Sequence, residues 1–440
     1  MVGPSSSAPP PGGATPGSGS AADGGGTTAE APIVSHAAPR SITPTTLKDL
    51  RDAVTAGTVL IRGTGTATTW GAPVRDPRTT VSLAGMDRVL DHRPADMTVH
   101  VQGGIRLDAL QAQLALRGQW LPYDPARSEA TIGGLLATGD AGPRRLAYGS
   151  LRELVIGATM VFPDGAIAKS GGHVIKNVAG YDLAKLCHGS LGTLGVVAEL
   201  VLRVHPLPQT SRTVMVSGVD TAAAQRLTWA LTRSATEPTA IEWCEPEQVL
   251  AVRFDGTSDG AAARAAAARA LLRGSLAELD ADESASFWHS HAVRIVAEPG
   301  DTVLRAATRP GIDPSLVRSL AAWAEHAGVK ALLTCSPAVG GYTVRVTGGD
   351  AKAHAELVKN WRASVEAVGG FVMLRRRRPG VDAMVESWGR APGGVDVMRR
   401  VKGNFDPENR FGNAFTAEVG LTPSQSEREH LNDCVLPAEE

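Results

Sequence analysis

Cysteine is scarce in this chain, and its four cysteines are scattered. Cys187, Cys244, Cys335 and Cys434 form no Cys-x-x-Cys pair and have no histidine at metal-ligand spacing. This pattern argues against a disulfide framework and against an iron–sulfur cluster, and it is typical of a reducing compartment. We therefore expect a cytoplasmic protein that holds no cluster of its own.

Long apolar runs and an excess of one charge are also missing. No run approaches the roughly 20 apolar residues of a membrane span, and 44 basic side chains are balanced by 45 acidic ones. The net charge of −1 argues against a nucleic-acid partner, because neutralising phosphates requires clustered basic side chains. The 440 residues are enough for two or three domains with a large buried core.

Large apolar residues are nearly absent from residues 1–38, which are mainly Gly, Pro, Ser, Ala and Thr. Such a segment cannot bury enough apolar surface to offset its ordering entropy, so we expect a disordered tail. It has neither the basic start nor the apolar centre of a signal peptide. A docking tail is the less favoured alternative.

Glycine, in contrast, is dense between Pro122 and His205. It falls at 133, 134, 139, 142, 149, 157, 165, 171, 172, 180, 189, 192 and 195. Glycine lets a backbone approach a ligand closely and adopt positive φ, at an entropic cost. The pattern predicts loops whose N–H groups surround a large phosphorylated ligand. A loop-rich β domain with tight turns is the alternative.

Several elements can be placed from local patterns. A helix behind a hydroxyl cap is expected within Pro44–Val54, and a buried strand at Thr58–Ile61. Strands Leu154–Val161 and Ala166–Lys169 form a predicted hairpin, and Gly260–Arg273 a predicted helix.

Three familiar motifs are incomplete. Thr68 stands where a Rossmann fingerprint has its third glycine, and Asp140 follows Gly139 where a P-loop needs lysine. His188 stands where a serine-hydrolase nucleophile elbow has glycine. An ATP site and a serine hydrolase are therefore disfavoured.

Five other motifs occur in the order seen in the FAD-linked oxidases. They are Pro122-Tyr123-Asp124-Pro125, Ala130-Thr131-Ile132-Gly133-Gly134, Tyr148-Gly149-Ser150, Lys176-Asn177-Val178-Ala179-Gly180-Tyr181-Asp182-Leu183 and Gly192-Thr193-Leu194-Gly195-Val196-Val197. The chain resembles the flavoenzymes of the vanillyl-alcohol oxidase and p-cresol methylhydroxylase type, and among these the FAD-binding (E) subunit of glycolate oxidase. The resemblance implies an α+β fold, with a two-part FAD-binding domain and an α+β cap domain.

The resemblance and a change of composition after Pro208 suggest the domain boundaries. We expect an FAD-binding domain at 39–208, the cap at 209–374, a C-terminal segment returning to the FAD domain at 375–417, and a polar tail at 418–440. The C-terminal segment contains Lys402-Gly403-Asn404-Phe405-Asp406-Pro407, which resembles the closing segment of these enzymes. Asn413 stands near the place of their Asn-Pro-Gly sequence.

The resemblance also implies the surroundings of the cofactor. The loop after the first strand would wrap the FAD pyrophosphate, and Thr66-Ala67 replaces a histidine that some relatives bond to the flavin, so we expect non-covalent FAD. Thr131 would cap a short helix whose first turn offers free N–H groups to a phosphate. The predicted cofactor-binding residues are Arg62, Gly63, Thr64, Gly65, Thr66, Asp124, Pro125, Thr131, Ile132, Gly133, Gly134, Thr138, Gly139, Tyr148, Gly149, Gly195 and Val197.

Two clusters stand outside the motifs. Trp288-His289-Ser290-His291 could present two histidines on a strand, but no third ligand has recognisable spacing, so we expect no metal and a partly exposed strand end. Arg375–Arg378 is interpreted as a solvated strand end, with binding of an acidic partner as the alternative.

The expected function follows from the resemblance. Catalytic relatives carry a Glu-His-Gly or paired-histidine segment, and this chain has none; His289 and His291 lack the acid and glycine neighbours. We therefore expect the FAD-binding subunit of a glycolate (2-hydroxy acid) dehydrogenase complex. Its partners would be a paralogous catalytic flavoprotein and an iron–sulfur subunit that passes electrons towards quinone, at the inner face of the membrane. The alternatives are a self-sufficient FAD-dependent hydroxy-acid or sugar-alcohol dehydrogenase and a non-catalytic assembly subunit.

Overall fold

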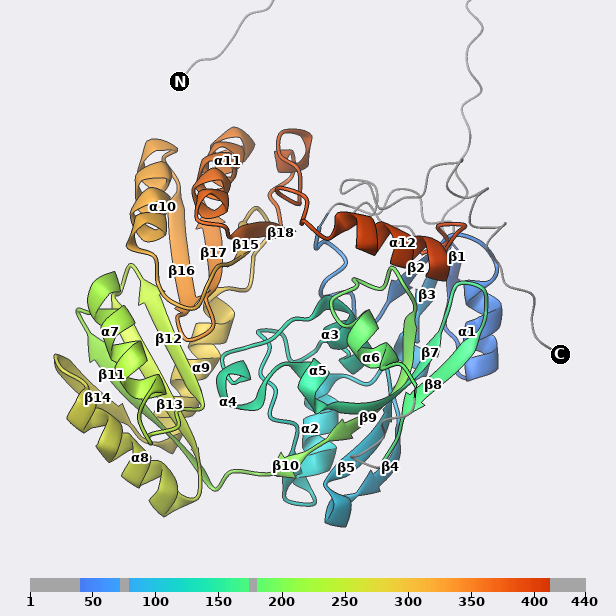
Figure 1. Cartoon of the computed structure of the whole chain (residues 1–440), viewed down its shortest axis with the longest axis horizontal. Helices are drawn as coiled ribbons and strands as arrows, with labels where there is room; N and C mark the ends of the chain where they lie inside the picture. Colours follow the sequence, from blue (N-terminus) through green and yellow to red (C-terminus); the bar gives the residue numbers. More distant parts are fainter. Residues whose placement is uncertain (1–39, 72–78, 174–179, 412–440) are drawn as a thin grey trace, which may run out of the picture. The chain divides into compact units, whose positions relative to one another are not determined.

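The computed structural model describes residues 40–71, 79–173 and 180–411, which belong to one unit of the chain, Pro39–Glu440 (Figure 1). Four sequence predictions lie outside the described residues. They are the disordered tail at 1–38, the Lys176–Ala179 part of one motif, Asn413, and the polar tail at 418–440.

A small parallel sheet and a capped helix open the described chain. The sheet has the order β1-β3-β2, with β1 at Arg40–Ile42, β3 at Thr79–Ser82 and β2 at Val59–Arg62. Helix α1 (Leu47–Val54) follows Thr46, whose hydroxyl accepts a hydrogen bond from Asp49 N at 3.1 Å. The predicted helix behind a hydroxyl cap is confirmed.

An antiparallel five-stranded sheet follows, in the order β4-β5-β9-β7-β8. Its strands are β4 (Val89–Arg93), β5 (Thr98–Gln102), β9 (Val196–Arg203), β7 (Val155–Val161) and β8 (Ile167–Gly171). The predicted hairpin of β7 and β8 is confirmed by their register. The short strands β6 (Gln119–Trp120) and β10 (His205–Pro206) pair separately.

Five helices lie between these strands, and most of them share a hydrophobic core with the five-stranded sheet. They are α2 (Leu107–Ala115), α3 (Ile132–Thr138), α4 (Arg145–Tyr148), α5 (Leu151–Leu154) and α6 (Leu183–Cys187). Short 3₁₀ turns occupy Leu83–Gly85, Pro94–Asp96 and, later in the chain, Val381–Ala383.

Residues 210–376 build an eight-stranded antiparallel sheet from two βαββαβ units of the ferredoxin-like type. The first unit is β11 (Thr210–Ser217), α7 (Thr221–Thr232), β12 (Ala240–Glu245), β13 (Val249–Gly256), α8 (Ser258–Leu271) and β14 (Ser275–Leu279). The second is β15 (Thr302–Ala307), α10 (Pro314–His326), β16 (Lys330–Ser336), β17 (Gly341–Thr347), α11 (Ala351–Ala367) and β18 (Phe371–Arg376). The order β14-β11-β13-β12-β16-β17-β15-β18 joins the units through their second strands. The sheet is therefore an internal duplication.

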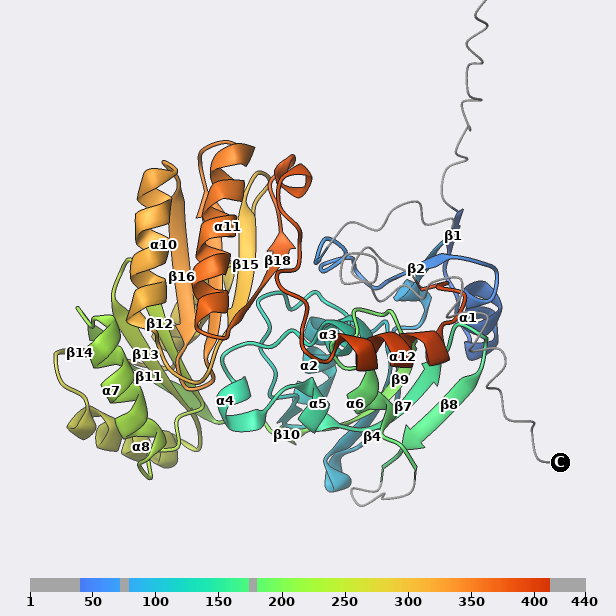
Figure 2. The ribbon, with the colours of Figure 1, turned by 45° about the horizontal axis from the view of Figure 1, so that its top comes forward.

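The two faces of this sheet are covered unequally. Helices α7, α8, α10 and α11 pack on one face and form the largest core with it (Figures 1 and 2). On the opposite face, α9 (Ala281–Arg294) packs through Trp288 against strands of the first unit. Part of the second unit's face is therefore left free to line a pocket.

The expectation of a strand end at Trp288–His291 is wrong, because these residues lie within helix α9. Asp280 and Glu283 form a capping box at its start. Ser284, Trp288 and His291 are all buried, at the i, i+4, i+7 spacing of one helix face. That spacing was visible in the sequence, but the i, i+2 pair of histidines suggested a strand.

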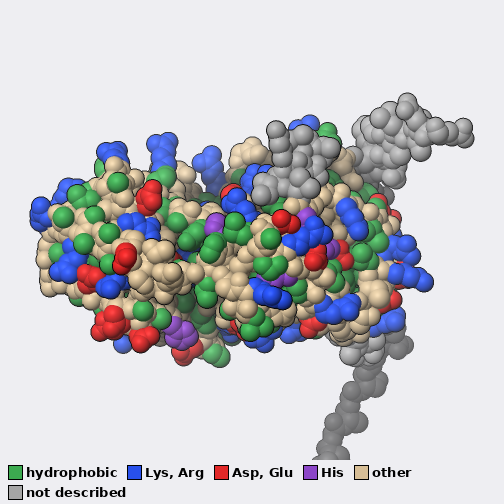
Figure 3. Space-filling model, turned by 90° about the horizontal axis from the view of Figure 1, so that it is seen from below, with side chains coloured by type: hydrophobic (Ala, Val, Ile, Leu, Met, Phe, Trp, Pro, Cys, Tyr) green, Lys and Arg blue, Asp and Glu red, His purple; other side chains and the backbone are tan. Residues whose placement is uncertain are grey.

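Helix α12 (Val395–Phe405) is the last helix among the described residues, and it contacts residues that precede position 208. The Phe405 ring lies 5.1 Å from that of Phe162, and Lys402 Nζ donates to the carbonyl of Thr193 at 2.9 Å. On the face shown in Figure 3, basic and acidic side chains are interspersed, as the near-zero net charge suggests.

Candidate functional site

A cleft of about 1060 Å³, its open mouth included, lies where the loop after β2 meets α3 and the start of β9. Its walls contain most of the residues predicted to bind the cofactor. These are Arg62, Gly63, Thr64, Gly65, Thr66, Thr131, Gly133, Gly134, Thr138, Gly195 and Val197.

The loop after β2 presents unused hydrogen-bond donors. Among the described residues, the N–H groups of Thr64, Gly65 and Thr66 have no hydrogen-bond partner. Thr68 Oγ1 donates to the carbonyl of Gly65 at 3.1 Å, which holds the turn closed. Consecutive free N–H groups in a turn form a concave anion site, so this loop can hold a pyrophosphate.

The expectation that the first turn of α3 offers free N–H groups to a phosphate is wrong. Ile132 N donates to the carbonyl of Ile105 at 2.9 Å, and Gly133 N donates to the carbonyl of Gly103 at 2.8 Å. Gly134 N donates to the hydroxyl of Thr131 at 3.2 Å. The segment between β5 and α2 runs close enough to accept these bonds, so α3 contributes to the cleft by packing.

Glycine at position 63 makes that packing possible. A Cβ atom on Gly63 would lie 2.2 Å from Thr131 Oγ1, far inside van der Waals contact. The loop after β2 therefore rests directly on the cap of α3.

Six predicted cofactor residues lie outside the walls of this cleft. Ile132 is fully buried in the core, and Gly139 ends α3 with φ 62°. The Tyr148 ring packs edge-on against Trp120 and His205, and Gly149 ends α4. The other two, Asp124 and Pro125, line a second pocket.

The prediction missed other residues in the cleft walls. Leu191 lines the cleft with φ 55°, which is unusual for a residue with a side chain, and its N–H donates to the carbonyl of Ala137 at 2.7 Å. Trp70, Arg127 and Asp140 also line the cleft. No local sequence pattern marks these residues, because they meet only in the fold.

The second pocket, of about 920 Å³, lies between residues 124–144 and the open face of the eight-stranded sheet. Asp140 lines both pockets. A smaller pocket, lined by Trp70, Asp140 and Arg375, adjoins both of them. The ionisable groups of the second pocket are Asp124, Asp140, Arg144, Glu242, Arg253, His289, His291, Arg305 and Arg375.

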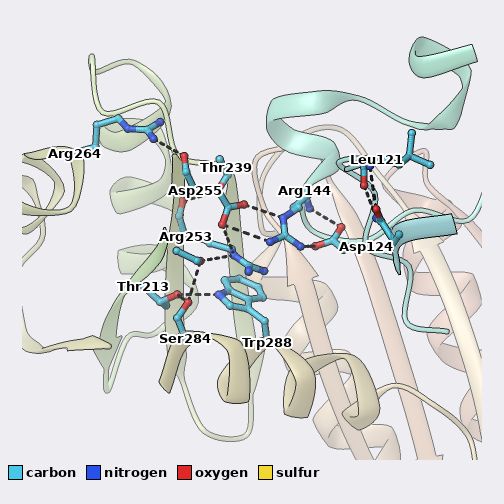
Figure 4. A network of polar contacts seen from close by, with 12 residues as sticks. Leu121, Asp124, Arg144, Thr213, Thr239, Arg253, Asp255, Arg264, Ser284 and Trp288 are labelled. Atoms are coloured by element: carbon cyan, nitrogen blue, oxygen red, sulfur yellow. Dashed lines mark hydrogen bonds and ion pairs between the residues drawn. The ribbon is translucent and has the colours of Figure 1, made fainter. Parts of the chain in front are cut away.

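Arg144, Asp124, Asp255 and Arg253 form one ionic network, which we call the interface network (Figure 4). Arg144 Nε lies 2.8 Å from Asp255 and its Nη1 3.6 Å from Asp124; Arg253 Nε lies 3.0 Å from Asp255. Burial raises the pKa of Asp124 to about 6, although Arg144 opposes the shift. Trp288 lies under Arg253, with the guanidinium 5.5 Å from the ring.

His291 is held between two side chains of β12. Its Nε2 lies 3.5 Å from Glu242 Oε2, and its Nδ1 lies 3.5 Å from Cys244 Sγ. Burial lowers the pKa of His291, but the contacts with Cys244 and Glu242 outweigh burial and raise it to about 10. The contacts with Glu242 and Cys244 thus favour the protonated form of His291, and its acid partner lies 49 residues away in sequence.

The interpretation of Arg375–Arg378 as a solvated strand end is wrong. Arg375 Nη1 pairs with Asp140 at 2.8 Å, and its guanidinium lies 3.9 Å from the centroid of the Trp70 ring. Arg377 bonds the carbonyl of Gly71, and Arg378 donates to the carbonyl of Gly300 at 3.1 Å. Both Trp70 and Asp140 come from the first half of the chain, so sequence alone could not pair them with this run.

Within the described ranges, no cluster of three or more His, Cys, Asp or Glu side chains is arranged to hold a metal. None of the described helices is both long and apolar enough to cross a membrane. The cysteines at 187, 244 and 335 are free and buried.

This chain is similar to known proteins in sequence and in fold. Residues 39–171 match the family model of the FAD binding domain. The chain is 36% identical over 168 residues to glycolate oxidase subunit GlcE of Escherichia coli, 38% of this chain and 47% of the relative. It is 32% identical over 196 residues to subunit GlcD of Bacillus subtilis, 44% and 42% of the two chains. A D-lactate dehydrogenase of Anaerostipes hadrus is 39% identical over 129 residues, 29% and 27% of the two chains.

The chain thus matches less than half the length of each of these curated relatives. A solved alkyldihydroxyacetonephosphate synthase superposes with a TM-score of 0.65 at 19% identity, over 84% of this chain and 76% of that one. That likeness concerns the fold alone. Residues 39–171 thus match an FAD binding domain, and the chain has the α+β fold of the alkyldihydroxyacetonephosphate synthase structure.

Proposed function

We propose that this chain is an FAD-dependent oxidoreductase for a small 2-hydroxy acid and serves as the FAD-binding subunit of a dehydrogenase complex. Two relatives are named as glycolate oxidase subunits and another as a D-lactate dehydrogenase, which supports this substrate class. The observation that carries the proposal is the arginine-rich second pocket that adjoins the FAD cleft.

The residues of the cleft fit FAD. The free N–H groups of Thr64, Gly65 and Thr66 would hold the pyrophosphate, and a further pocket beside Gly63 and Thr64 lengthens the cleft. Among the described residues, none of those that line the cleft is a histidine or cysteine, so we propose non-covalent binding. When bound, FAD supplies the acceptor for the hydride of the hydroxy acid.

The chain's own side chains would bind and orient the acid. Arg305 and Arg375 line the second pocket and can hold a carboxylate through their planar donor groups. The neighbouring Thr343 hydroxyl accepts a hydrogen bond from Arg305 Nη1 at 2.8 Å and so fixes its direction.

A self-sufficient dehydrogenase is a second candidate, because the same pocket contains two histidines. Glu242 favours the protonated form of His291, whereas the side chain of His289 is exposed and makes no hydrogen bond among the described residues. His289 is therefore the histidine available to accept the hydroxyl proton. The lack of a Glu-His-Gly segment favours the subunit proposal, whereas the two histidines in the second pocket favour the self-sufficient dehydrogenase.

Visible spectra of the purified chain test both candidates. Under the subunit proposal, the chain binds FAD, and anaerobic glycolate or D-lactate bleaches it only after a partner flavoprotein and an iron–sulfur subunit are added. Bleaching of the chain alone would establish the second candidate. A chain that stays colourless after incubation with FAD would contradict both.

A further inference from the structure

Three of the four arginines in the second pocket have a carboxylate partner. Arg144 and Arg253 pair with Asp255 at 2.8 and 3.0 Å, and Arg375 pairs with Asp140 at 2.8 Å. Arg305 is different. Its Nη1 donates to Thr343 Oγ1 at 2.8 Å, and it forms no ion pair with any described residue.

Another arginine of the same sheet shows how such a charge is compensated elsewhere. In the first unit, Asp255 lies two residues beyond Arg253 on β13, hence on the same face, and supplies its counter-charge. In the second unit, the residues two positions from Arg305 on β15 are Val303 and Ala307. Arg305 therefore has no acidic neighbour on its own strand that could balance its charge.

Nearby groups make this arrangement unfavourable without a ligand. Burial and the charge of Arg375 together lower the pKa of Arg305 to about 10, although Asp140 and Glu242 oppose the shift. Arg375 Nε is itself buried and has no hydrogen-bond partner among the described residues. Two neighbouring guanidinium groups thus have donors to spare, and an anion beside them would supply the missing charge.

The charges of the pocket also limit how many anionic groups it can compensate. At neutral pH, Arg144 and Arg253 are balanced by Asp124 and Asp255. Arg375 is balanced by Asp140, and His291 by Glu242. Among the described residues that line this pocket, one arginine, Arg305, remains without an ion-pair partner, and the carboxylates that act on it, Asp140 and Glu242, are already paired with Arg375 and His291.

We infer that the second pocket binds a substrate with a single carboxylate, held by Arg305 and Arg375, and discriminates against dicarboxylic 2-hydroxy acids. A second carboxylate would enter a pocket in which every other cation already has its partner, and it would lose its hydration without compensation. This inference rests on the proposed function and specifies its substrate class.

Binding of unreactive acids tests the inference on the full, FAD-loaded chain. We expect calorimetry to show that oxamate, a monocarboxylate, binds at least tenfold more tightly than malonate, a dicarboxylate. Arg305→Met should weaken oxamate binding by at least thirtyfold. Arg345→Met removes another partly buried arginine from the same sheet, but one that pairs with Asp301 outside the pocket, and should change oxamate binding less than twofold.

Thermal stability separates a binding role of Arg305 from a structural one. Without ligand, Arg305→Met should raise Tm, because it removes an uncompensated charge. Arg375→Met should lower Tm, because it leaves Asp140 without its partner. A lower Tm in Arg305→Met with unchanged oxamate binding would make Arg305 structural and overturn the inference.

Turnover distinguishes failure of this inference from failure of the proposed function. In the system that bleaches, glycolate or D-lactate should exceed D-2-hydroxyglutarate and D-malate in kcat/KM by at least tenfold, and Arg305→Met in this chain should abolish that preference, which assigns it to this pocket and not to a partner flavoprotein. If a dicarboxylic acid is preferred, the inference fails and the proposed function stands. If no hydroxy acid bleaches the flavin in any combination of subunits, the proposed function fails.

Discussion

At the scale of single residues, the buried ammonium group of Lys402 connects the last helix to the FAD cleft. It pairs with Asp406 and donates to the carbonyl of Thr193, which follows Gly192 in the cleft wall. Lys402→Met would leave the Asp406 carboxylate buried without its cation. We expect the free energy of unfolding to fall by about 3–5 kcal/mol in urea titrations, together with weaker FAD binding.

Lys185→Met is the matched control for that substitution. Lys185 also pairs with an aspartate of its own helix end, Asp182, but both side chains are almost half exposed. Its loss should cost about 0–1 kcal/mol. Equal losses in the two variants would contradict the role given to burial at Lys402.

A second residue-scale prediction concerns Asp124 and pH. Its folded pKa of about 6 lies above its ordinary value of 3.8, because burial outweighs Arg144. The folded state therefore binds the proton more tightly, so this stabilisation is complete below pH 3.8 and is lost as pH rises through 6.

In the wild type, the backbone N–H of Arg144 donates a hydrogen bond to Asp124 Oδ1 at 3.0 Å. Asp124→Asn removes the titration but keeps an oxygen that can accept this bond. We compare the free energies of unfolding of the wild type and the variant. Their difference, wild type minus variant, should decrease by about 2–3 kcal/mol between pH 4 and pH 7. Urea titrations at several pH values measure it. A difference that rises with pH would show that the ion pair with Arg144 dominates instead.

At the scale of elements, the loop after β2 and helix α3 are fitted to each other. Gly63→Ala would place a methyl group against Thr131 Oγ1 and displace the loop whose N–H groups are free. Overpacking of this kind costs about 1–3 kcal/mol, so we expect the Kd for FAD to rise about tenfold, as measured by flavin fluorescence. Gly393→Ala, where the added methyl meets no atom, should leave the Kd unchanged.

Local signals predicted the elements whose causes are local. The hydroxyl caps of α1 and α3 and the β7–β8 hairpin were placed correctly, because capping and turn chemistry act within a few residues. The free N–H groups expected on α3 were wrong, since carbonyls from a distant segment accept those bonds. The domain boundaries at 208 and 374 stay predictions.

The second pocket shows what sequence could not supply. Glu242 meets His291 across 49 residues, and Arg375 meets Asp140 and Trp70 across much longer separations. Each pairing depends on how the chain folds around the eight-stranded sheet, whose strand order no local sequence pattern predicts. The residues of the proposed substrate pocket could therefore not be brought together from the sequence, whereas most residues of the first cleft could.

At the scale of the whole molecule, the interface network joins residues before 208 to the eight-stranded sheet. Arg144 is its central member, since it pairs with Asp255 of β13 and with Asp124, and lies 4.6 Å from the Trp120 ring. Arg144→Met would remove the charge that these two carboxylates share. Because Asp255 keeps Arg253, we expect a loss of about 3 kcal/mol, the low end for a broken buried pair.

Arg144→Met should also let the eight-stranded sheet separate more often from the residues before 208. Residues 207–209 connect β10 to β11, so weaker contact across the interface network should expose them to protease more often. Limited proteolysis of Arg144→Met should accelerate cleavage there, and saturating oxamate should slow it again through Arg305 and Arg375. Arg212→Met breaks a partly exposed pair with Glu278 inside the sheet and should leave the cleavage rate unchanged. If both variants are cleaved at the wild-type rate, contacts other than the interface network hold the sheet against the FAD binding domain.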